Sequence, residues 1–93
     1  MELEKLHLKV GGKVQGVGFR YATQTQARRL GLSGWVRNLA TGDVEIEVVG
    51  KKEILATFIT WCHQGPPHAE VAHVDILSKE SLGENPFQSF DIK

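Results

Sequence analysis

A glycine-rich run that ends in an arginine is the part of this sequence best suited to binding a phosphate group. The run reads Gly12-Lys13-Val14-Gln15-Gly16-Val17-Gly18-Phe19-Arg20. Gly16 and Gly18 can adopt positive φ and carry no Cβ, so consecutive backbone N–H groups around them can point into one concavity. The planar guanidinium of Arg20 can meet two phosphate oxygens at once, which a lysine cannot do. We therefore expect residues 15–20 to form an anion-binding loop, which we call the anion cradle.

The elements on either side of the anion cradle are predicted to be a strand and a helix. Residues 6–10 alternate between apolar and polar side chains, which is the period of a strand with one buried face. The segment from Phe19 to Leu30 is predicted to be a helix that stops at Gly31, with a thin apolar stripe of Ala22, Ala27 and Leu30. The first turn of this helix would add unpaired N–H donors and about half a positive charge at the cradle.

The remaining segments predict the element order βαββαββ. They comprise a hairpin with strands at 35–37 and 44–49, a helix at 51–63, strands at 71–77 and 90–92, and a polar turn at 81–86. This order is typical of an α+β ferredoxin-like sandwich, in which an antiparallel sheet of four to five strands carries both helices on one face. We expect the strands at 6–10 and 71–77 to lie near the centre of the sheet. Asn38, at the end of the strand at 35–37, is expected to lie close to the anion cradle.

Two separate motifs resemble those of a known family. The cradle sequence is similar to the first signature of the acylphosphatases, Gly-x-Val-Gln-Gly-Val followed by Gly or Phe, an aromatic residue and Arg. The run Gly34-Trp35-Val36-Arg37-Asn38, with Gly42, Val44 and Gly50 after it, resembles their second signature. The similarity continues through residues 65–71 and 90–92, so it covers essentially the whole chain. It implies a single free-standing acylphosphatase domain over residues 1–93.

The resemblance implies hydrolysis of acyl phosphates to a carboxylate and inorganic phosphate, with Arg20 and Asn38 as the catalytic residues. The leaving group is a carboxylate, so its expulsion needs little help from a general acid. Catalysis then depends on holding the phosphate oxygens and aligning the attacking oxygen with the leaving one. The loop Gln15, Gly16, Val17, Gly18, Phe19 and Arg20 is expected to hold the phosphate. The side-chain amide of Asn38 can orient a water molecule without removing its proton.

Other functions and roles stay open at this point. The anion cradle would bind phosphate in a noncatalytic sensor as well as in an enzyme, and related segments handle acyl phosphates in larger hydrogenase maturation proteins. An RNA-binding sheet is disfavoured, because residues 44–49 offer two carboxylates and no aromatic ring for stacking. Asn38 could also start the hairpin turn by bonding its own backbone. Gln15 could either contact the ligand or stabilise the loop.

The composition predicts a small cytoplasmic protein. The chain has 93 residues, with 11 Lys plus Arg and 11 Asp plus Glu, so no overall positive field attracts nucleic acid or a membrane surface. The single cysteine excludes an internal disulfide framework, and the N-terminus lacks the apolar length of a signal peptide. We expect a monomer that acts on a small-molecule acyl phosphate, releases inorganic phosphate, and does not bind nucleic acid or membranes.

The other titratable side chains are expected to be structural or solvated. The four histidines match no usual spacing of metal ligands, so neither a metal nor a cofactor is expected; they are His7, His63, His68 and His73. Cys62 lies on the apolar stripe of the predicted second helix and is expected to be a buried small hydrophobe. Glu45 and Glu47 are expected to be solvated charges that need no partner.

Overall fold

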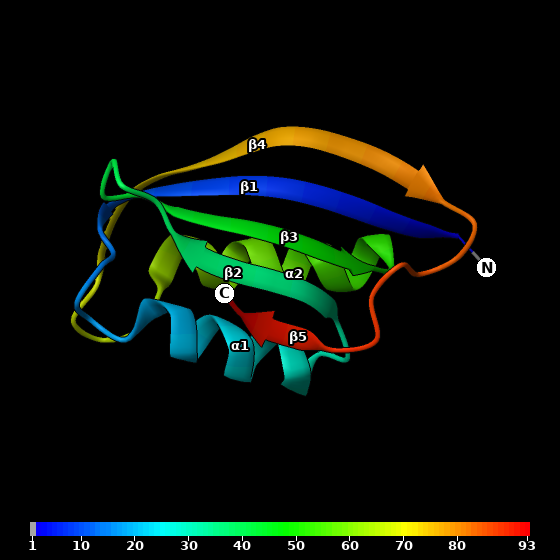
Figure 1. Ribbon diagram of the computed structural model, residues 1–93, viewed down its shortest axis with the longest axis horizontal. Coiled ribbons are helices and arrows are strands. Elements are labelled where there is room, and N and C mark those ends of the chain that lie inside the picture. Colours follow the sequence, from blue (N-terminus) through cyan, green and yellow to red (C-terminus); the bar gives the residue numbers. More distant parts are fainter. Residues whose placement is uncertain (1) are drawn as a thin grey trace.

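Five strands form one sheet, and two helices cover one of its faces, in the computed structural model, which describes residues 2–93 (Figure 1). The elements are β1 (Leu3–Lys13), α1 (Phe19–Arg29), β2 (Ser33–Asn38), β3 (Val44–Gly50), α2 (Lys52–Gln64), β4 (Glu70–Leu82) and β5 (Phe90–Ile92). This order is the predicted βαββαββ, and the α+β ferredoxin-like class is confirmed. Met1, the first residue of the predicted domain, lies outside the described residues. Neither helix in residues 2–93 is long and apolar enough to span a membrane.

The strand order of the sheet is β4-β1-β3-β2-β5. The first four strands pair antiparallel as predicted, and β5 extends the sheet by pairing parallel to β2. The prediction that the strand after the second helix lies near the centre was wrong, because β4 is an edge strand. Each helix connects two strands that are separated in the sheet by one other strand. The connection through α1 runs from β1 to β2, and β3 lies between them. By the same rule α2 carries β4 past β1 to its outer side, where two register shifts interrupt the pairing.

The buried side of α1 differs from the predicted apolar stripe. Ala27 is fully buried, but Ala22 and Leu30 are only half-buried, and Phe19 and Thr23 take the remaining core positions. Thr23 can be buried because its hydroxyl donates a 2.7 Å hydrogen bond to the carbonyl of Phe19, so no polar atom is left unpaired. The buried ring of Phe19 therefore anchors the first turn of α1, where the anion cradle ends.

Aromatic rings join the two helices to the sheet. The ring of Phe58 on α2 lies 6.4 Å from that of Trp61 and 6.4 Å from that of Phe90 on β5, and the Phe19 ring lies 5.7 Å from that of Trp61. Cys62 is fully buried in the same layer, as predicted, and burial raises the pKa of its thiol well above the ordinary value. The start of α1 thus packs against the hydrophobic core.

The open face of the sheet carries an ion-pair network that centres on Glu45. His7 Nε2 lies 2.6 Å from one oxygen of Glu45, and Arg37 Nε donates to the other at 2.5 Å. The Glu45 side chain is only 13% exposed, and Glu47 pairs with Lys5 at 4.0 Å. The prediction that both glutamates are solvated charges without partners was therefore wrong. Partial desolvation raises the pKa of Glu45, but the hydrogen bonds and charges of His7 and Arg37 outweigh it and hold the pKa below its usual value of 4.5.

This network predicts acid-dependent stability. Because the folded pKa of Glu45 lies below its unfolded value, the group stabilises the fold above about pH 4.5, and this contribution is lost as the pH falls through the folded pKa. We expect Glu45→Gln to lower the urea midpoint at pH 6 and to have little effect at pH 3. Glu80→Gln is the control, since Glu80 pairs with Lys5 at 3.3 Å but is 58% exposed. A Glu45→Gln deficit that is equal at both pH values would contradict the prediction.

Candidate active site

Two loops meet at one end of the sheet and bring the two signature motifs together. One loop follows β1 and leads into α1, and the other connects β2 with β3; Figure 1 shows both at the same end of the molecule. The side-chain amide of Gln15 joins them, donating hydrogen bonds of 2.8 Å to the carbonyl of Leu39 and 2.9 Å to that of Asp43. Of the two roles open for Gln15, the structure supports stabilisation of the loop, because both amide hydrogens are used within the protein.

Gln15 is therefore expected to act as a positioning residue. Gln15→Ala would remove two hydrogen bonds and release the β2–β3 loop, at whose start Asn38 lies. A displacement of about 1 Å in a reacting group can cost a hundredfold in rate, so we expect kcat to fall by about ten- to a hundred-fold with a smaller change in phosphate affinity. Steady-state kinetics with an acyl phosphate, together with inhibition by inorganic phosphate, measure the two effects.

A matched control exists on α1. Gln24 donates a 3.1 Å side-chain hydrogen bond to the carbonyl of Phe90, at a partly buried position away from the loops. Gln24→Ala should lower stability by about 1 kcal/mol, the usual value for one such bond, and leave kcat nearly unchanged. Equal losses of kcat in the two variants would mean that Gln15 acts through stability alone.

The anion cradle has the backbone geometry expected from its glycines. Gly16 and Gly18 have φ of 75° and 77°, and a Cβ built at either position meets no atom within 4 Å. Glycine is therefore needed for its conformation and not for lack of space. Gly18 caps α1 without a side-chain hydrogen bond, and the first intrahelical bond runs from Ala22 N to Gly18 O at 3.0 Å. The N–H groups that precede it in the first turn are free to bind an anion.

A cavity of about 220 Å³ opens over the cradle. Its lining comprises Val14, Gln15, Gly16, Gly18, Phe19, Arg20, Tyr21, Asn38 and Ile92. Five residues of the predicted cradle thus meet Asn38, which follows Arg20 by 18 positions. Val17 is not part of the lining, since its side chain packs against the core. The Phe19 ring is also buried, so only its backbone can face a ligand.

Sequence reasoning missed three lining residues: Val14, Tyr21 and Ile92. Tyr21 follows the signature arginine directly, and its position on the exposed side of the first helical turn was the available signal. Ile92 could not be found from local patterns, because it reaches the cavity only through the parallel pairing of β5 with β2, where it lies opposite Val36.

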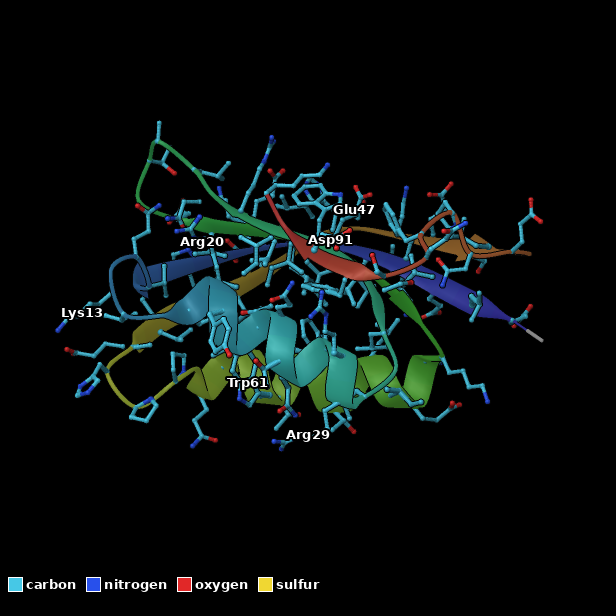
Figure 2. All side chains as sticks on the ribbon, turned by 60° about the horizontal axis from the view of Figure 1, so that its bottom comes forward. Lys13, Arg20, Arg29, Glu47, Trp61 and Asp91 are labelled. Atoms are coloured by element: carbon cyan, nitrogen blue, oxygen red, sulfur yellow. The ribbon has the colours of Figure 1, made fainter. Side chains whose placement is uncertain are left out.

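Arg20 and Asn38 each carry an unpaired polar group at this cavity. Figure 2 shows Arg20 beside the start of α1, at the end of the molecule where the loop after β1 turns. Arg20 is exposed, and no carboxylate of residues 2–93 forms an ion pair with it. Asn38 Oδ1 is buried and has no hydrogen-bond partner within the described chain. A buried acceptor without a hydrogen-bond donor costs free energy of folding.

The cavity therefore has groups that can bind an anion, and one of its lining residues, Asn38, has a hydrogen-bond acceptor that is unpaired within residues 2–93. Free N–H groups, the helix dipole and the guanidinium of Arg20 favour a phosphate, and Asn38 belongs to the same lining. No group of three or more His, Cys, Asp or Glu side chains in residues 2–93 is placed to hold a metal ion. His63, His68 and His73 are exposed, and His7 pairs with Glu45 on the open face of the sheet.

Comparison with known proteins agrees with the two motifs. The acylphosphatase family model matches residues 6–92. An acylphosphatase of Thermococcus kodakarensis is 44% identical over 88 residues, covering 95% of this chain and 97% of the relative. One from Acaryochloris marina is 52% identical over 83 residues, covering 89% and 86%. The solved acylphosphatase of Coxiella burnetii superposes with a TM-score of 0.86 at 35% identity and covers 98% of this chain and 93% of its own. This chain belongs to the acylphosphatase family.

Proposed function

We propose that this protein is an acylphosphatase, a hydrolase that splits the carboxyl-phosphate bond of acyl phosphates into a carboxylate and inorganic phosphate. Family membership over residues 6–92 supports the activity. The cavity that contains both Arg20 and Asn38 supports the assignment of the site.

The anion cradle binds the phosphoryl group in this proposal. The backbone N–H groups of residues 15–19 and the first turn of α1 donate to its oxygens, and the Arg20 guanidinium donates to two of them. The backbone donors are held in place by the fold before the substrate arrives, so they stabilise charge on the equatorial oxygens without reorganising in the transition state.

The attacking water is oriented by Asn38. Its Oδ1 accepts a hydrogen bond from the water, whose oxygen then forms a bond to phosphorus while the bond from phosphorus to the acyl oxygen breaks. The carboxylate leaves with the electron pair of that bond, and the water proton passes to a phosphate oxygen. No phosphoenzyme forms, and neither a metal nor another cofactor takes part.

One observation favours an enzyme over a noncatalytic phosphate sensor. A sensor needs only the cradle, whereas the unpaired and buried Oδ1 of Asn38 in the same lining suits a water molecule better than an anion. An acceptor oxygen facing a phosphate would repel it, so the atom is useful where a donor must be held beside the phosphate.

Hydrolysis in water labelled with heavy oxygen tests this function. With benzoyl phosphate as substrate and a chelator present, we expect steady release of phosphate that carries one labelled oxygen, and unlabelled benzoate. Label in the benzoate would refute attack at phosphorus. Binding of inorganic phosphate without any turnover would favour the sensor.

We further propose that the protein acts in the cytoplasm as a monomer that does not bind nucleic acid. Its net charge is zero and it has one cysteine. β3 presents Glu45 and Glu47 on the open face of the sheet, where an RNA-binding sheet would use aromatic rings. Sedimentation at micromolar concentration, with and without a single-stranded oligonucleotide, tests the oligomeric state and the lack of nucleic-acid binding.

A further inference from the structure

The last part of β1, just before the anion cradle, contains two consecutive glycines against which β4 packs closely (Figure 1). A Cβ on Gly12, whose φ is 120°, would lie only 2.6 Å from the backbone nitrogen of Ala72. Ala72 is the extra residue of β4 at this point, where the register shifts between Gly11 and Gly12. An irregularity of this kind re-aims the side chains beside it, and the residue that follows Ala72 is His73.

The ring of His73 fills the place that a side chain on Gly11 would take. The two residues are register partners, and a Cβ built on Gly11 would overlap the His73 ring and lie 3.1 Å from Oδ1 of Asp43. The other carboxylate oxygen of Asp43, Oδ2, accepts a 3.1 Å hydrogen bond from the hydroxyl of Thr41. The imidazole of His73 and the carboxylate of Asp43 thus share the space above Gly11, one from each side of β1.

Asp43 also holds the β2–β3 loop together through its backbone. Its carbonyl oxygen accepts a 2.8 Å hydrogen bond from the N–H of Leu39 and the 2.9 Å bond from the side-chain amide of Gln15. Leu39 directly follows Asn38, so the position of Asp43 bears on that of the residue assigned to the attacking water.

We propose that His73 is a positioning residue for the reaction, which steadies Asp43 and with it the β2–β3 loop that places Asn38. The proposal rests on the proposed function, in which Asn38 orients the water. The imidazole has a carboxylate on either hand, because its Nε2 also lies 3.6 Å from Oδ2 of Asp75 on its own strand. Ring N–H groups donate to such oxygens, and a protonated ring also attracts them by charge.

Substitutions at His73 and Gly11 test this contact from both sides. His73→Ala removes the ring, and Gly11→Ala displaces it, because the new methyl group would meet the far end of a side chain that can rotate away. We expect each to lower kcat by about three- to ten-fold, within the range for residues that act on a site through others, and to change the inhibition constant of phosphate by less than about twofold. The double variant should lose no more kcat than either single variant, since both remove one interaction.

Two further histidine variants serve as rescue and control. His73→Gln keeps an N–H donor on a side chain of similar reach, so it should recover most of the kcat. His63→Ala is the matched control, since His63 is also exposed but lies in the last turn of α2, and its kcat should equal that of the natural protein. Natural kcat in both His73→Ala and Gly11→Ala, or losses that add in the double variant, would overturn the proposal.

Amide hydrogen exchange separates this proposal from the hydrolytic function. The N–H of Leu39, which is bonded to Asp43, reports on the loop without any substrate. Its exchange should become severalfold faster in His73→Ala and in Gly11→Ala, but not in His63→Ala. If exchange changes in this way and no acyl phosphate is hydrolysed, the support of the loop stands and the hydrolytic function fails. If the natural protein hydrolyses acyl phosphates but both variants keep its kcat and its exchange rate, the positioning role is refuted and the function stands.

Discussion

Replacing Arg20 by alanine is expected to remove most of the activity. A charge-assisted hydrogen bond to phosphate is worth about 1.5–3 kcal/mol, so phosphate binding should weaken by about ten- to a hundred-fold. The loss in kcat/KM should be larger, on the order of a thousandfold, because charge on the phosphoryl oxygens is fully developed only in the transition state. Arg20→Lys should recover little, since an ammonium cannot contact two oxygens in a fixed plane. Kinetics with benzoyl phosphate and inhibition by inorganic phosphate measure both effects.

Arg28→Ala provides the matched control for Arg20. Arg28 is also exposed and lies on α1, but in the last turn and away from the cavity. The two variants lose the same charge from the same helix, so a general electrostatic effect would weaken both alike. Near-normal kcat/KM in Arg20→Ala, or a comparable loss of kcat/KM in Arg28→Ala, would show that Arg20 does not bind the substrate.

Replacing Asn38 by alanine should separate turnover from binding. Loss of one positioned polar group costs about a hundred- to a thousand-fold in kcat, and we expect a fall of this size. The inhibition constant of inorganic phosphate should change by no more than a few fold, because the cradle donors are untouched.

Stability offers a second readout for Asn38. Its buried Oδ1 has no partner in residues 2–93, so alanine removes an unsatisfied acceptor and breaks no hydrogen bond at that atom. We expect urea unfolding of Asn38→Ala to show stability equal to or above that of the natural protein, despite its low kcat. A variant that lost stability and phosphate binding together would show that Asn38 is structural.

The helices and the cradle could be predicted from sequence because their signals are local. Helical spacing of apolar residues placed the two helices within one residue of their observed ends, at Phe19–Arg29 and Lys52–Gln64. The positive φ of Gly16 and Gly18 follows from the one residue type that adopts it readily. Those predictions needed no knowledge of distant neighbours.

The missed features depend on neighbours far along the chain. β4 runs from Glu70 to Leu82, beyond the predicted 71–77 and into the predicted turn, because pairing with β1 sustains a strand whose side chains are mostly exposed. Glu45 appeared solvated in sequence because its partners, His7 and Arg37, belong to two other strands. Ile92 joins the cavity through strand pairing, which the alternation of β5 does not encode.

The two register shifts in β4 have a consequence for self-association. β4 spans 13 residues at the edge of the sheet, and within residues 2–93 its outer side has no partner strand. A long and regular edge of this kind is a template for fibre growth, since its N–H and C=O groups can pair with another chain. The irregularities opposite His7/Leu8 and Gly11/Gly12 break the repeat that an incoming strand must match. The irregular edge therefore disfavours self-association of this protein through β4.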